Sequence, residues 1–195
     1  MPSSADPVAL HRRLWGDGAG DSEAELCAAE GRLGVSLPLR LREFLGAAAL
    51  RRSVQLHLEP LAQVRWDDDV LVFGADQQRS AFFGIERAAV SLADPPVVVG
   101  PIEPAPHWRG DCPSLSLWLC GFSLLNRAYE PPCANECVPD DRMPGWEPWQ
   151  VAGNTLFALG RAASDGVNVG AVTRRELIAA LQSLDLEEDE VEIFE

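Results

Sequence analysis

The chain of 195 residues contains no lysine, and all 16 of its basic residues are arginine. It has 30 acidic residues, so its formal net charge is −14 and its isoelectric point is near 4.5. This excess of negative charge disfavours direct binding to a nucleic acid backbone and favours a basic partner. Because negative charge also keeps proteins soluble, charge alone does not distinguish a binding role from solubility.

Long hydrophobic runs are also absent. No apolar run approaches the roughly 18 residues that a transmembrane helix needs, so we expect no membrane-spanning segment. The first residues, MPSSADPVALHRRLWGDG, lack the apolar core and the small-residue cleavage site of a secretory signal. We therefore expect a cytoplasmic protein.

The usual enzyme signatures are missing from the sequence. It has no GxGxxG, GxxxxGK or GxSxG motif. The three histidines, His11, His57 and His107, are far apart in the sequence. Cys112 or Cys120 with His107 as a base could form a nucleophilic pair, but no spacing singles out this arrangement. We expect a protein that is not an enzyme.

Cysteine number and spacing argue against a disulfide framework and against a metal site. Five cysteines cannot all pair, and a reducing cytosol would not maintain such pairs. Four of them lie in one third of the chain, at Cys112, Cys120, Cys133 and Cys137, with seven, twelve and three intervening residues. Zinc sites commonly use CxxC pairs. We expect no metal or other cofactor, and a small metal-dependent enzyme built on these four cysteines remains an alternative.

Several segments have the apolar spacing of amphipathic helices. The clearest follows Ser22, which forms a possible capping box with Glu25 and is followed by a helix stop at Gly34. A second helix is expected directly after Pro38. The other expected helices lie at 7–15, 114–126 and 173–184.

Period-two patterns and turn residues predict strands in the middle of the chain. A strand is expected at 54–58, and a hairpin is expected from 70–74 and 81–86. The prolines around 95–101 suggest an edge strand. Residues 130–150, rich in proline, are expected to form an ordered loop pinned by tryptophan rings. The acidic end of the chain is expected to be either a solvated tail or a short edge strand.

Together these patterns predict an α+β fold, with a mostly antiparallel twisted sheet and helices packed against it. We expect an N-terminal arm at 1–20 and an α+β core at 21–128. A Pro- and Trp-rich loop, a helix and an acidic tail at 129–195 are expected to pack on that core.

Several motifs follow one another in a characteristic order. A helix ending at Leu33-Gly34 is followed by Leu37-Pro38 and by a helix with Phe44-Leu45. Val72-Phe73-Gly74 then closes a strand, and a Leu-rich helix follows at 116–125. This order resembles the SUKH superfamily, the fold of fungal cell-wall synthesis regulators and of many bacterial toxin-immunity proteins. The resemblance covers roughly residues 22–127. It implies that the helices are scaffolding and that function lies in surface residues.

We therefore expect a non-catalytic protein-binding module. The resemblance implies a cytoplasmic immunity protein that occludes the active site of a basic toxin domain of the nuclease type. A regulatory or scaffold module that docks onto a cellular protein is the alternative. Acidic residues would steer a basic partner, and tryptophans are frequent interface anchors. The residues expected to bind the partner are Trp66, Asp67, Asp68, Asp69, Trp108, Trp146, Trp149, Glu187, Glu188, Asp189, Glu190 and Glu192.

Overall fold

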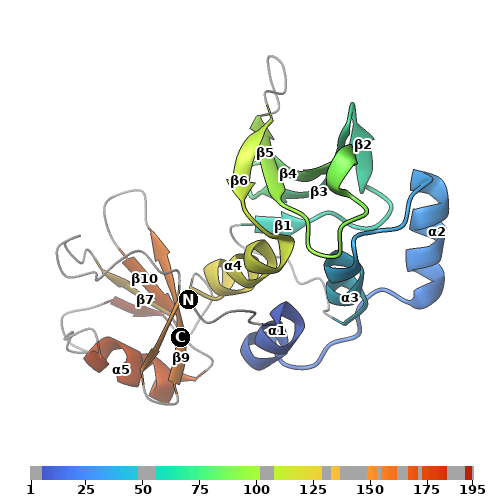
Figure 1. The fold of residues 1–195 in the computed structure, drawn as a ribbon. Helices are drawn as coiled ribbons and strands as arrows, with labels where there is room; N and C mark the ends of the chain where they lie inside the picture. The colour runs from blue at the N-terminus through green and yellow to red at the C-terminus, as the bar shows by residue number, and fades with distance from the viewer. Residues whose placement is uncertain are drawn as a thin grey trace. The chain divides into compact units, whose positions relative to one another are not determined.

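The chain forms two compact units, Met1–Cys120 and Gly121–Glu195, and each has its own antiparallel sheet (Figure 1). The structure is a computed structural model. It describes residues 6–47, 56–101, 108–128, 133–136, 149–152, 155–161, 167–170, 173–183 and 192–194. Helices pack with antiparallel sheets in this part of the chain, so the expected α+β fold is confirmed, although with two sheets in place of one.

Three helices open the first unit: α1 (Pro7–Trp15), α2 (Glu23–Leu33) and α3 (Leu39–Ala47). The capping box expected at the start of α2 is confirmed. The backbone N–H of Glu25 donates to Ser22 Oγ at 3.3 Å, and the backbone N–H of Ser22 donates to Glu25 Oε2 at 2.8 Å. Gly34 ends the helix with φ of 69°. Local sequence signals therefore define α2 at both ends.

The leading helix α1 packs against α3. Leu10 and Leu14 are buried, and the ring centroids of His11 and Phe44 are 5.0 Å apart in an edge-to-face arrangement. The segment expected as an N-terminal arm is therefore a packed part of the first unit. The apolar spacing of residues 7–15 predicts the helix, but it does not show which element the helix packs on.

The sheet of the first unit is built around a central hairpin of β3 (Val70–Asp76) and β4 (Ala81–Glu86). Both β1 (Leu56–Leu58) and β2 (Arg65–Asp67) pair with β3, β1 along its C-terminal half and β2 along its N-terminal half. The order continues from β4 to β5 (Val97–Pro101) and β6 (Arg109–Cys112), and all pairs are antiparallel. The short 3₁₀ helix η1 (Arg87–Ala89) follows β4.

Different side chains pack on the two faces of this sheet. On one face, Trp118 of α4 (Leu115–Ala128) contacts Phe73 and Phe83, with ring centroids 5.0 and 5.1 Å apart. On the other face Val70, Val72 and Val98 form a small apolar cluster, against which the partly buried Phe82 and Trp108 pack. β3 is thus buried on both sides, which explains its continuous apolar sequence.

The interpretation of residues 95–101 as an edge strand was wrong. β5 pairs with β4 on one side and with β6 on the other. Proline is tolerated here because Pro101 is the last residue of the strand and lies beyond the residues of β5 that pair with β6, Val97–Val99. β6 was not expected from the sequence, because its residues, RGDC, are polar and turn-like.

The second unit has a five-stranded sheet in the order β11–β7–β10–β9–β8, with α5 (Arg174–Ser183) packed on β9 and β10. The strands are β7 (Cys133–Glu136), β8 (Trp149–Ala152), β9 (Thr155–Arg161), β10 (Val167–Gly170) and β11 (Glu192–Phe194). The prediction of a loop over 130–150 was wrong at β7 and at the start of β8. At the acidic end, β11 pairs with β7, so the edge-strand alternative holds there.

Candidate functional site

The acidic cluster expected to bind a partner lies at the tip of the β2–β3 hairpin. Asp67 and Val70 are paired across the turn, and Asp68 has φ of 49°. Asp69 forms an ion pair of 2.8 Å with Arg87, which comes from the segment after β4. One of the three carboxylates therefore already has a cation beside it, and Asp67 and Asp68 provide the remaining negative charge.

Trp66 is engaged within the protein on its ring face and at its N–H group. The guanidinium carbon of Arg87 lies 3.8 Å from the ring centroid, a cation–π contact. The indole Nε1–H donates to the backbone carbonyl of Leu33 at 3.0 Å. The structure thus brings Trp66, Asp69 and Arg87 together at one hairpin tip and ties that tip to the end of α2.

Trp108 lies just before β6, on the face of the sheet opposite Trp118. Its ring lies over Gly100, where a Cβ atom would be 2.9 Å from the ring, and it packs on Val70 and Val72. Its Nε1 atom is buried and donates to none of the residues that the structure describes. The structure therefore places Trp108 beside β3, the strand that begins directly after the acidic cluster.

The remaining predicted partner residues belong to the second unit. Trp149 is the first residue of β8 and Glu192 the first residue of β11. The expected positions Trp146, Glu187, Glu188, Asp189 and Glu190 lie outside the described residues. The second unit has 14 acidic residues against 5 arginines, whereas the first has 16 against 11. Most of the net negative charge is therefore carried by the shorter unit.

The four cysteines of the zinc alternative are divided between the two units. Cys112 in β6 and Cys120 in α4 belong to the first unit, Cys133 in β7 belongs to the second, and Cys137 lies outside the described residues. Burial raises the pKa of Cys112 and raises that of Cys120 to about 12, so both are neutral thiols at pH 7. In the described part of the chain, no three His, Cys, Asp or Glu residues are grouped to hold a metal.

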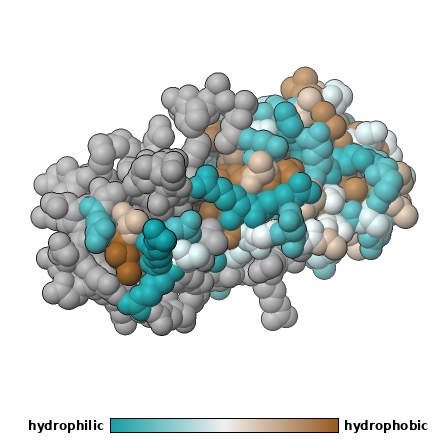
Figure 2. Space-filling view, turned by 90° about the horizontal axis from the view of Figure 1, so that it is seen from below, coloured by the Kyte–Doolittle hydropathy of each residue, from teal (hydrophilic) through white to brown (hydrophobic). Residues whose placement is uncertain are grey.

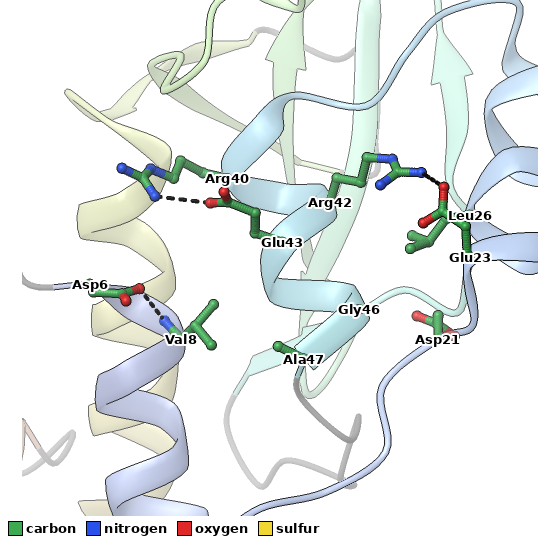
Figure 3. A pocket seen from close by; sticks show the side chains of 10 residues that line it. All are labelled: Asp6, Val8, Asp21, Glu23, Leu26, Arg40, Arg42, Glu43, Gly46 and Ala47. Carbon is green, nitrogen blue, oxygen red and sulfur yellow. Dashed lines mark hydrogen bonds and ion pairs between the residues drawn. The ribbon is translucent and has the colours of Figure 1, made fainter.

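An open cavity of about 500 Å³ lies along α3, between the first turns of α1 and α2 (Figure 3). We call it the α3 cavity. Its lining is mostly charged, with four carboxylates and two guanidinium groups around a few small or apolar residues. The lining residues are Asp6, Val8, Asp21, Glu23, Leu26, Arg40, Arg42, Glu43, Gly46 and Ala47.

Both arginines of the α3 cavity are paired within the protein. Arg40 and Glu43 are 2.9 Å apart on successive turns of α3. Arg42 pairs with Glu23 of α2 and also lies 3.3 Å from Glu30. These contacts raise the pKa of the Arg42 guanidinium and lower that of the Glu23 carboxyl. Both positively charged side chains of the cavity therefore form ion pairs with glutamates of the same chain.

Two carboxylates of the α3 cavity have no such arginine among the residues that the structure describes. Asp6 caps α1 and accepts a hydrogen bond from the backbone N–H of Val8 at 3.0 Å. Asp21 precedes the cap of α2, and its Oδ2 atom is buried and accepts no hydrogen bond from any described residue. Burial, and next the charge of Glu25, raise the pKa of the Asp21 carboxyl. The cavity lining thus includes a carboxylate with no arginine beside it among the described residues.

Three exposed leucines lie near the N-terminal end of α3. They are Leu39, Leu92 and Leu117, which are 51, 52 and 37% exposed and are the exposed large apolar residues in the described part of the chain. Loop 91–95 connects their segments. Its Ala93 carbonyl accepts from the N–H of Arg40 at 3.2 Å, and Asp94 Oδ1 accepts from the N–H of Ser116 at 2.7 Å.

We call the three leucines and the α3 cavity together the α3 face. Arg40, which lines the cavity, follows Leu39 in the sequence, but none of the three leucines is itself a lining residue. Figure 2 shows hydrophilic residues across the visible face of the first unit, with hydrophobic residues in small groups between them. Apolar anchors beside charged groups are typical of surfaces that bind other proteins.

The α3 face could not be predicted from the sequence. Ser22 and Glu25 mark the start of α2, but no motif indicates that Asp21 lacks a partner. The exposure of the leucines could not be predicted either, because a leucine on a helix is usually interpreted as a core residue.

Comparisons with family models, with curated proteins and with solved structures found no match for this chain. The resemblance to the SUKH superfamily therefore stays a prediction. No helix within the described residues has the length and apolar character needed to cross a bilayer.

Proposed function

We propose that this chain is a non-catalytic protein-binding module of the SUKH type that acts as a cytoplasmic immunity protein. It would neutralise a toxin by covering the toxin's active site. The observation that carries the proposal is the α3 face, which has exposed leucines near the N-terminal end of α3 and a charged cavity along the same helix. One carboxylate of that cavity, Asp21, has no ion pair among the described residues. Such a surface offers apolar anchors and a charge for a partner to match.

A basic toxin of the nuclease type is the partner that fits the charge of the chain. A nuclease presents arginine and lysine to phosphate groups, so a protein with net charge −14 meets it with an opposite field. Electrostatic steering can bring association rates to about 10⁸ M⁻¹s⁻¹ at low salt. The same field repels nucleic acid and anionic membranes, so we propose that the chain binds neither directly.

The apolar anchors would supply most of the affinity. Interfaces commonly depend on a few residues that are buried on binding, whereas charges at the rim mainly affect the association rate. Leu39 and Leu92 are about half exposed. Their chain neighbours, Arg40 and Ala93, form the hydrogen bond that joins α3 to loop 91–95. They are therefore held in place before a partner binds.

Co-expression and inhibition assays test this function. The protein is produced together with a nuclease toxin encoded beside its gene, and cell survival and nuclease activity are measured. We expect survival and complete inhibition at a one-to-one ratio. The double variant Leu39→Ser/Leu92→Ser should weaken inhibition at least tenfold, because each buried leucine contributes about 1.5–3 kcal/mol.

The control for that variant is Gln77→Ser/Gln78→Ser in the exposed β3–β4 turn, which should inhibit like the wild type. Failure of the wild-type protein to protect cells or to inhibit the nuclease would contradict the immunity function. Isolation of a stable complex with a cellular assembly, in the absence of any toxin, would favour the regulatory alternative. Inhibition unaffected by the leucine variant would place the binding surface elsewhere.

A further inference from the structure

The α3 cavity has an imbalance of charge that a partner could correct. Arg40 and Arg42 are each held by glutamates of the protein itself. Asp21 has no ion pair with any residue that the structure describes, and its buried Oδ2 atom has no donor there. Asp21 as a whole is only partly buried and lines the open cavity. A cationic donor from outside would therefore meet a carboxylate that has no ion pair among the described residues.

Asp21 is held in this position by its backbone. Its N–H donates to the carbonyl of Leu45 at 2.9 Å, which ties the start of α2 to the end of α3. The preceding Gly20 is so close to α3 that a Cβ atom there would be 2.3 Å from the same carbonyl oxygen. The backbone of Asp21 is therefore held beside α3, and the residue stays part of the cavity lining.

The size and openness of the cavity suit a side chain that enters from outside. At about 500 Å³ it falls within the range of small-ligand sites, about 300–1,000 Å³. Figure 3 shows Asp21 at the start of α2, opposite Gly46 of α3, with Glu23 and Glu43 drawn toward the two arginines. Gly46 and Ala47 have little or no side chain, so this part of the lining leaves space beside Asp21.

We propose that the α3 cavity receives a cationic side chain of the partner, an arginine in particular, with the Asp21 carboxylate as its main acceptor and Asp6 as a second negative charge. Arginine fits better than lysine because its planar group offers five donors in a fixed arrangement and is less strongly hydrated. The proposal deepens the proposed function and rests on it for the identity of the partner as a basic protein.

A small-molecule titration tests the cavity without the partner. The probe is Nα-acetyl-arginine methylamide, and the neutral control is Nα-acetyl-citrulline methylamide, which has nearly the same shape. Amide shifts of the ¹⁵N-labelled protein are followed by NMR. We expect saturable shifts at Asp21, Gly46 and Ala47 with the arginine probe, and at least tenfold weaker binding of the citrulline compound.

Two substitutions identify the acceptor. Asp21→Asn keeps the size of the side chain and removes its charge, and it should weaken binding of the arginine probe at least fivefold. The matched control is Asp17→Asn, which removes a carboxylate that is 93% exposed and lies 3.6 Å from Arg12. This control should bind like the wild type. Comparison of the amide spectra before titration shows whether each variant is folded.

Several outcomes would overturn the proposal. Equal binding by Asp21→Asn and the wild type would exclude Asp21 as the acceptor. Shifts spread over many acidic surfaces would show a general charge effect with no cavity site. Tighter binding of Nα-acetyl-lysine methylamide than of the arginine probe would contradict the preference for a guanidinium group.

The proposed function and this inference can fail separately. If the protein inhibits a basic toxin and Asp21→Asn inhibits equally well, the cavity is not the receptor and the immunity function stands. If the arginine probe binds at Asp21 and no basic protein partner exists, the cavity site stands and the immunity function is wrong. A complex in which Asp21→Asn raises the dissociation rate at least fivefold supports both.

Discussion

Gly20 determines how closely the segment before α2 approaches the end of α3. A Cβ atom at this position would be 2.3 Å from the carbonyl oxygen of Leu45 and 2.5 Å from the carbonyl carbon of Gly46. Both are backbone atoms, so no flexible side chain can move aside. The position of Asp21 at the α3 cavity therefore depends on the absence of a side chain at the residue before it.

We predict that Gly20→Ala lowers the free energy of unfolding by about 1–3 kcal/mol, because the two segments must separate. The matched control is Gly31→Ala within α2, where a new Cβ would have no atom within 4 Å. That variant should gain about 0.5–1 kcal/mol, since glycine is unfavourable inside a helix. Urea denaturation measures both changes. A Gly20→Ala protein as stable as the wild type would show that the close approach is not structurally important.

At the scale of elements, α2 begins at a capping box. Both residues of the box are present in the sequence, and both hydrogen bonds are formed in the structure. Ser22 and Glu25 exchange hydrogen bonds between side chain and backbone, and Thr173 and Glu176 do the same at the start of α5. The Ser22 hydroxyl, followed by its backbone N–H, lowers the pKa of the Glu25 carboxyl. This helix end therefore has a pH dependence of known direction.

We predict that Ser22→Ala lowers the free energy of unfolding by about 1 kcal/mol at pH 7. Because the pKa of Glu25 is lowered in the folded state, its charge stabilises the protein above the ordinary value of 4.5. That stabilisation is lost as the pH falls through the lower folded pKa. The difference between wild type and Glu25→Gln should thus be largest near neutral pH and decrease below pH 4.5. Thermal unfolding at several pH values measures it, and a difference that grows in acid would contradict the assignment.

At the scale of the whole molecule, negative charge is distributed unevenly. The second unit has a net charge of −9 and the first of −5, although the first is the longer of the two. Asp69 is paired with Arg87, so the hairpin tip contributes less field than its three acidic residues suggest. Steering of a basic partner should accordingly depend more on the acidic end of the chain than on the hairpin tip.

We predict that Glu187→Arg/Glu188→Arg/Glu190→Arg slows association with a basic partner about tenfold at low salt, and that Asp67→Arg/Asp68→Arg slows it less. Dissociation should change little in both, as for charges at an interface rim. Stopped-flow measurements from low to high NaCl concentration test this, since screening should abolish the differences. If both variants associate as fast as the wild type, the electrostatic part of the proposed mechanism is wrong.

Elements with strong local signals could be predicted from the sequence. The helices after Ser22 and Thr173 have both a cap and an apolar stripe, and the β3–β4 hairpin has two apolar runs around a polar turn. β6 and β7 could not be predicted, because the polar residues RGDC and CANE form strands only where neighbouring strands offer backbone partners. The division of the strands into two sheets depends on the same long-range pairing.

The sequence by itself determined the α+β class, the main helices and the net charge, because these follow from local spacing and from composition. Only the tertiary structure decided which charges remain available. Arg87 reaches Asp69 from 18 residues away, and Arg42 reaches Glu23 from 19 residues away, while Asp21 is left without a cation among the described residues. Ion pairing depends on distances between side chains of remote segments, and those distances exist only after the chain has folded.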